Sequence, residues 1–118
     1  QKWDPNRVRS YLQQPLDWAA QHAIPANRMV AGEFGCMRKL LGCQQYLEDV
    51  LSALEAARVH WAFYSFREDS WDGMDYELGS ANVPWAYWKA VEDGQPDPVK
   101  RSATAEFEPI SKRLKKSE

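Results

Sequence analysis

The sequence predicts an α/β fold in which helices alternate with parallel strands. Two short runs, about residues 28–33 and 59–66, are rich in apolar and aromatic side chains, as buried strands are. Apolar residues at helical spacing come before, between and after these runs. Because the segment between the runs is too long for a hairpin and has room for a crossover helix, we expect the two strands to be parallel.

The first helix is expected to begin at Asp4-Pro5, since Asp caps helices well and Pro fits the first helical turn. Pro15 lies inside the same stretch. Proline removes a backbone donor and crowds the preceding turn, so we expect a kink or a restart of the helix there. The apolar positions of this helix are Val8, Leu12, Leu16 and Ala19.

Three further helices are predicted. The second spans about 44–57, the third begins at Pro84 and is stopped near Gly94, and a short terminal helix covers about 106–116. The second strand is apolar throughout, which indicates burial on both of its faces. A long polar loop over 67–84 follows this strand, and loops of that length in compact domains are often functional.

The first strand ends on a carboxylate, Glu33, with Gly32 before it and Gly35 shortly after it. Gly35 is expected to let the backbone turn sharply. The carboxyl ends of parallel strands are where α/β folds build their sites, so Glu33 is a candidate for chemistry. The alternative is a solvated glutamate in a strand-to-helix loop.

Alternation along the strands predicts which side chains share a face. On the second strand, Ala62 and Tyr64 point the same way, and Trp61 and Phe63 point outward to pack on helices. On the first strand, one face carries Met29, Ala31 and Glu33, and the other carries Val30 and Phe34. Each strand would then place a small residue below a functional one.

The composition limits the possible functions. A chain of 118 residues with 44% hydrophobic residues makes one domain or part of one. Its net charge of −2 gives no reason to expect nucleic acid, and no apolar run is long enough for a membrane span. Cys36 and Cys43 could bridge across a loop, but partly buried free thiols are the favoured interpretation. No metal site or cofactor is expected.

Length also limits the architecture. A complete βα barrel takes about 250 residues and eight strands. This chain has about half that length and two predicted strands, whose edges and faces would be only partly covered by their own helices. The sequence therefore reads as a piece of a barrel.

Several motifs together resemble the C-terminal part of glycoside hydrolase family 5, a group of cellulase-like TIM-barrel retaining glycosidases. These motifs are Gly32-Glu33-Phe34-Gly35, Arg38, Tyr46-Leu47, the segment from Trp61 to Glu68, and Trp71. The resemblance covers about Asp4 to Trp88. It implies a partial (β/α)8 TIM barrel, the last two βα units over about 4–94, with a C-terminal tail or short helix over 95–118. It also suggests a secreted or periplasmic hydrolase of β-linked polysaccharide or oligosaccharide.

The resemblance gives roles to individual residues. Glu33 matches the family's catalytic nucleophile. Tyr64 occupies the position where the family usually has a tryptophan that stacks under the sugar, which is a departure from the pattern. Trp71, Arg38 and Glu68 would contribute to substrate binding.

The family's acid/base glutamate follows an asparagine on strand four, and this chain has no Asn-Glu pair. The chain alone is therefore expected to be inactive, and its partners would be a carbohydrate substrate and the remaining barrel strands. Glu68 or Asp72 could substitute as the acid. In the simpler interpretation, Glu68 pairs with Arg38 or Arg67 and Asp72 is solvated.

Two other functions remain open. The chain could be a non-catalytic carbohydrate-binding module that uses Tyr64 and Trp71 as a platform, because flat aromatic rings suit sugar faces. It could instead be a self-associating fragment, in which copies cover one another's strand edges.

Overall fold

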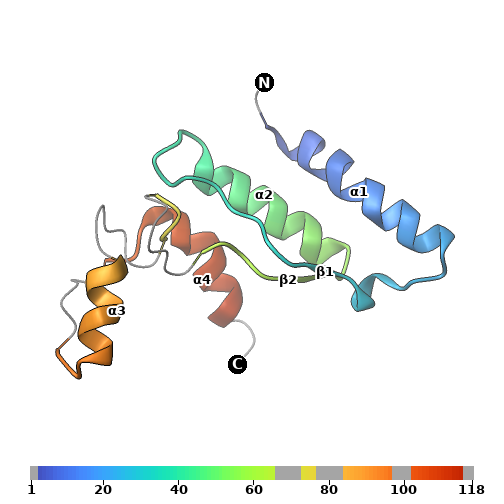
Figure 1. Ribbon diagram of the computed structural model, residues 1–118. Coiled ribbons are helices and arrows are strands. Elements are labelled where there is room, and N and C mark those ends of the chain that lie inside the picture. Colours follow the sequence, from blue (N-terminus) through green and yellow to red (C-terminus); the bar gives the residue numbers. More distant parts are fainter. Residues whose placement is uncertain (1–2, 66–72, 77–83, 97–101, 116–118) are drawn as a thin grey trace.

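The computed structural model describes residues 3–65, 73–76, 84–96 and 102–115 of the chain. This part is mostly helical, with two short parallel strands (Figure 1). Its elements are α1 (Pro5–Gln21), the 3₁₀ turn η1 (Ala26–Arg28), β1 (Val30–Ala31), α2 (Cys43–Ala56), β2 (His60–Trp61), α3 (Pro84–Glu92), η2 (Ala105–Phe107) and α4 (Glu108–Leu114). None of the helices in these residues is long and apolar enough to cross a bilayer. The predicted order of helices and strands is confirmed, although both strands are shorter than expected.

Helix α1 begins as the sequence predicts. The Asp4 carboxylate caps it by accepting a hydrogen bond from the backbone N–H of Arg7 at 2.9 Å. The expected restart at Pro15 does not occur, because α1 continues through it to Gln21. Pro15 lies on the exposed side of the helix. The Tyr11 carbonyl, which loses its helical donor to the proline ring, also belongs to an exposed residue and can be solvated by water.

The two strands pair in parallel, with Val30 beside His60 and Ala31 beside Trp61. Helices α1 and α2 lie side by side and run opposite to the strands (Figure 1). Both helices cover the same face of the sheet. The cluster that joins them to that face comprises Val8 of α1, Val50 and Leu54 of α2, and Val59, with Ala31 and Trp61 packed against it.

The other side of the sheet, which we call the open face, carries Val30, His60 and Ala62. All three residues are exposed, and Val30 is 65% exposed. The expectation that the second strand is buried on both faces is therefore wrong for the described residues. The physical reason is that the described helices that pack on the sheet do so from one side.

A buried arginine of α4, Arg113, makes several polar contacts with α2. Its guanidinium donates to both carboxylate oxygens of Glu48, at 2.8 and 3.0 Å, and lies 3.0 Å from the Glu55 carboxylate. It also donates to Ser52 Oγ and to the Pro109 carbonyl oxygen. Hydrogen bonds from Arg113, and next from Lys112, outweigh the effect of burial and lower the pKa of Glu48 to about 2. The predicted C-terminal helix is thus confirmed and forms part of the core.

Candidate functional site

The carboxyl end of β1 does not keep the regular strand register. The N–H groups of His60 and Ala62 donate to the carbonyls of Met29 and Ala31, at 3.1 and 2.9 Å. The next bond runs from Tyr64 N–H to the Phe34 carbonyl at 2.7 Å, which is one residue further along the first segment than the register requires. One extra residue is therefore accommodated between Ala31 and Phe34, as in a β-bulge.

This extra residue changes the faces that simple alternation predicts. Ala31 and Phe34 both pack toward the helices, and the Phe34 ring lies 6.3 Å from that of Trp61. The prediction that Ala31 lies on the opposite side from the helix-packed Trp61 is thus wrong. Because Phe34 returns to the helix side, its neighbour Glu33 is left exposed beside the open face.

Gly35 follows at a point where three chain segments come together. A Cβ at this position would collide with the carbonyl oxygen of Tyr64 and lie 2.6 Å from the hydroxyl of Tyr76. Gly35 does not have a positive φ, so close approach explains this glycine better than the sharp turn predicted from the sequence. The absence of a side chain lets the backbone after Glu33 lie directly against the end of the second strand.

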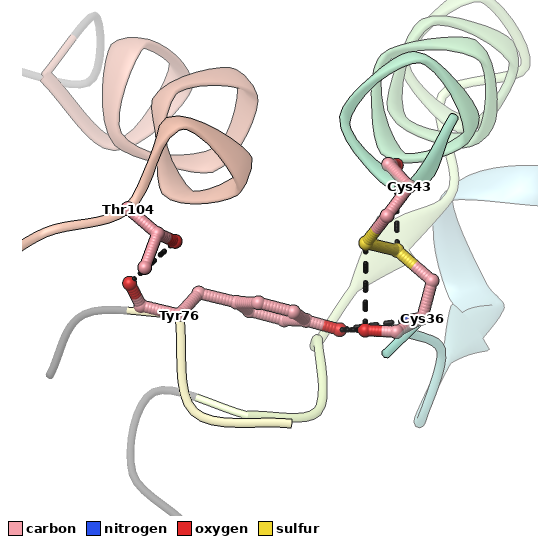
Figure 2. Close-up of a disulfide and its surroundings, with 4 residues drawn as sticks. All are labelled: Cys36, Cys43, Tyr76 and Thr104. Carbon is pink, nitrogen blue, oxygen red and sulfur yellow. Dashed lines mark hydrogen bonds between the residues drawn. A yellow bond between two sulfur atoms is a disulfide. The ribbon is translucent and has the colours of Figure 1, made fainter. Parts of the chain in front are cut away.

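The next residue, Cys36, is joined to Cys43 by a disulfide, with 5.6 Å between their Cα atoms. The expectation of free thiols is therefore wrong. Turns between the two cysteines bring the chain back to the start of α2, where Cys43 is the first helical residue (Figure 2). The spacing of the cysteines in the sequence does not specify this return, which depends on where α2 packs.

Tyr76 holds the backbone of the same cysteine. Its hydroxyl accepts a hydrogen bond from the Cys36 N–H and donates one to the Cys36 carbonyl, both at 2.7 Å (Figure 2). Burial raises the pKa of this hydroxyl, which therefore keeps its proton at neutral pH. At the other end of Tyr76, the carbonyl accepts from the N–H and the hydroxyl of Thr104, at 2.9 and 2.8 Å.

Sequence reasoning did not single out Tyr76, because the residue lies within the predicted polar loop. Residues 73–76 of that loop are in fact buried. The available signal was the apolar Met74, which lies beside Gly73 and between two aspartates.

Arg38 is held by the same buried segment. Its backbone N–H donates to the Gly73 carbonyl at 2.8 Å, and its Nε lies 3.6 Å from Asp75 Oδ1. Its side chain is only 14% exposed. Arg38 therefore fixes the loop after Glu33 to residues 73–76. The expected partner Glu68 lies outside the described residues.

The structure brings together some of the residues that the sequence singles out. Glu33 and Tyr64 both follow the carboxyl ends of neighbouring parallel strands, and the Tyr64 N–H donates to the carbonyl of Phe34, the residue after Glu33. Tyr64 is half-buried. Trp71 and Asp72 lie outside the described residues, as Glu68 does.

A separate open groove lies between the disulfide loop and α4. Polar residues along it include two pairs, the 2.7 Å contact between Lys112 and Glu48 and the 3.1 Å hydrogen bond from Gln44 to Glu108. Glu33 does not line this groove. Among the described residues, no group of His, Cys, Asp and Glu side chains is arranged to hold a metal ion.

Comparison of the chain with protein-family models, with curated proteins and with solved structures gave no match.

Proposed function

We propose that this chain is the nucleophile-bearing part of a retaining glycoside hydrolase similar to family 5, and that it forms the last two βα units of a (β/α)8 barrel. The observation that carries the proposal is the packing of α1 and α2 on one face of two adjacent parallel strands. In a βα barrel, helices cover only the outer face of the sheet, and the site lies at the carboxyl ends of the strands. Glu33 follows β1 at that end and is exposed beside the open face.

The proposed chemistry assigns Glu33 the role of nucleophile. Its carboxylate would attack the anomeric carbon of a β-linked glucan or mannan and form a glycosyl-enzyme intermediate. A second carboxyl group about 5–5.5 Å away must protonate the leaving oxygen and later activate water. We assign this group to barrel strands supplied by another segment or chain. Tyr64 and Trp71 are the proposed stacking residues for the sugar.

The disulfide supports a particular location for the protein. Disulfides persist in oxidising compartments and are uncommon in the cytosol of most organisms. The Cys36–Cys43 bridge therefore favours the secreted or periplasmic location that the family resemblance suggests.

The test is an activity assay on β-1,4-glucans and β-1,4-mannans. The chain is assayed alone and after assembly with an N-terminal barrel segment that supplies the missing strands. We expect activity only from the assembled protein. Glu33→Gln should lower it by about 10³-fold or more, because the amide is not a nucleophile. Glu92→Gln is the matched control, since Glu92 is exposed on α3. An assembled Glu33→Gln variant with full activity would rule out the nucleophile role.

The open face favours one further candidate, self-association. A 65% exposed valine on an unpaired side of a short sheet is a surface on which a second copy can pack. Light scattering on the isolated chain distinguishes the two possibilities. A defined oligomer that does not dissociate when the N-terminal segment is added would favour self-association over barrel completion.

A further inference from the structure

Residues 34–38, which follow Glu33 directly, are anchored at several points to parts of the chain far away in sequence. The Phe34 carbonyl accepts from Tyr64 N–H, the Cys36 side chain is bonded to Cys43, and the Arg38 N–H donates to the Gly73 carbonyl. Between the first and last of these anchors, the Tyr76 hydroxyl binds both backbone polar groups of Cys36. Such repeated anchoring fixes the backbone more tightly than a surface loop requires.

The Tyr76 hydroxyl is well placed to hold this backbone rigidly. Its residue is fully buried, with an exposed fraction of 0%, and its ring packs 6.1 Å from that of Phe63. Tyr76 N–H donates to the Ser65 carbonyl, and Thr104 binds the Tyr76 carbonyl through two donors. Tyr76 is thus fixed to Ser65, beyond the second strand, and to Thr104 in the segment before α4; Figure 2 shows the second of these attachments.

We infer that Tyr76 is a positioning residue for Glu33, a role that rests on the function proposed above. By holding Cys36 at both its N–H and its carbonyl, the hydroxyl sets the path of the backbone that leaves Glu33. Gly35, between Glu33 and Cys36, allows this close approach, since a side chain there would collide with Tyr64 and Tyr76. The position of the Glu33 carboxylate is thereby set through the backbone. Tyr76 itself does not contact the substrate.

The expected effect follows from the geometry of nucleophilic attack. Reacting atoms must approach to about 3–3.5 Å, and a misplacement of about 1 Å can lower the rate by about 100-fold. Tyr76→Phe keeps the buried ring but leaves the Cys36 N–H and carbonyl without their partner. We therefore expect attack by Glu33 to slow by about 10-fold or more, with little change in substrate affinity.

The experiment measures attack by Glu33 alone, in the assembled protein. The probes are the 2,4-dinitrophenyl 2-deoxy-2-fluoro-β-glycosides of cellobiose and mannobiose. A Glu33 carboxylate oxygen forms a bond to the anomeric carbon, while the bond from that carbon to the aryl oxygen breaks. Dinitrophenolate leaves with the electron pair and needs no proton, so the acid/base carboxyl group does not enter the step. The readouts are the limiting inactivation rate, the saturation constant and the labelled residue.

Tyr46→Phe is the matched control, because Tyr46 is also part-buried and packs against the cluster of Val8, Val50, Leu54 and Val59. In the expected result, Tyr76→Phe lowers the limiting rate by about 10-fold or more against both the unmodified protein and Tyr46→Phe. Its saturation constant should stay within about twofold. Equal rates of labelling at Glu33 in Tyr76→Phe and the unmodified protein would overturn the positioning role alone. Failure to label Glu33 in the unmodified protein would overturn the proposed function, and this inference with it.

A second variant covers the case in which Tyr76→Phe does not fold. Thr104→Val keeps the shape of the side chain and removes one of the two donors to the Tyr76 carbonyl. We expect a smaller fall in the limiting rate, about two- to fivefold, again with an unchanged saturation constant. Ser102→Ala, at an exposed position nearby, is its control. An unchanged rate in a folded Thr104→Val variant would count against the inferred role.

Discussion

Replacing Arg113 with methionine tests whether the charged cluster between α2 and α4 stabilises the fold. Arg113 is only 7% exposed, and its guanidinium contacts the carboxylates of Glu48 and Glu55. Methionine preserves most of the side-chain volume and removes the charge. The variant therefore removes the cation that the two carboxylates share. It creates no cavity in the core.

The expected loss of unfolding free energy can be estimated from how exposed the two carboxylates are. Breaking a fully buried ion pair destabilises a protein by about 3–5 kcal/mol, because one charge stays uncompensated in a dry site. Here the carboxylates of Glu48 and Glu55 are 31% and 46% exposed, so water can solvate them in the variant. We therefore expect a smaller loss, about 2 kcal/mol at pH 7. For a domain of this size, that corresponds to a fall in Tm of about 8 °C.

The pH dependence provides a second readout. The pKa of Glu48 is about 2 in the folded protein and 4.5 when unperturbed. A depressed folded-state pKa contributes stability above the unfolded value, and this contribution is lost as pH falls from 4.5 toward 2. The difference in unfolding free energy between the unmodified protein and Arg113→Met should therefore be largest above pH 5 and shrink below pH 4.

The assay is urea unfolding followed by far-UV circular dichroism, between pH 7 and pH 2.5. Lys112→Met is the matched control, because Lys112 also contacts Glu48 but is 42% exposed. Its removal should change stability by less than about 1 kcal/mol. A variant Arg113→Met as stable as the unmodified protein, or a stability difference that does not vary with pH, would refute the reasoning.

Two further predictions concern the loop after Glu33. Replacing both cysteines with serine should lower the unfolding free energy by about 2 kcal/mol, as expected for a short closed loop, and dithiothreitol should destabilise the unmodified protein equally. Denaturation curves with and without reductant test this, and identical curves would contradict it. Gly35→Ala should destabilise by about 1–3 kcal/mol, since its Cβ would lie 2.6 Å from the Tyr76 hydroxyl. Gly32→Ala has no atom within 4 Å of the added Cβ, so thermal unfolding should show little change for it.

The sequence alone predicted the features that depend on neighbouring residues. The Asp4 cap, the apolar stripe of α2 and the C-terminal helix all follow from spacings of three or four residues along one segment. The parallel pairing also followed, because connection length restricts strand direction. For the candidate site, the strand pattern placed Glu33 at the end of the first strand, whereas the strand ends two residues earlier, at Ala31, and Glu33 follows it in the chain.

The features that the sequence did not predict depend on pairing between segments that are distant in the chain. The register shift before Phe34 depends on which carbonyl of the first segment accepts from the Tyr64 N–H, and it places Phe34 on the side of Ala31 instead of on the side of Val30. The Cys36–Cys43 bond and the burial of Tyr76 required α2 and residues 73–76 to converge on one loop. A local pattern records the propensity of its own segment. Which segment lies against it is set by the total free energy of packing, and only the tertiary structure reveals that choice.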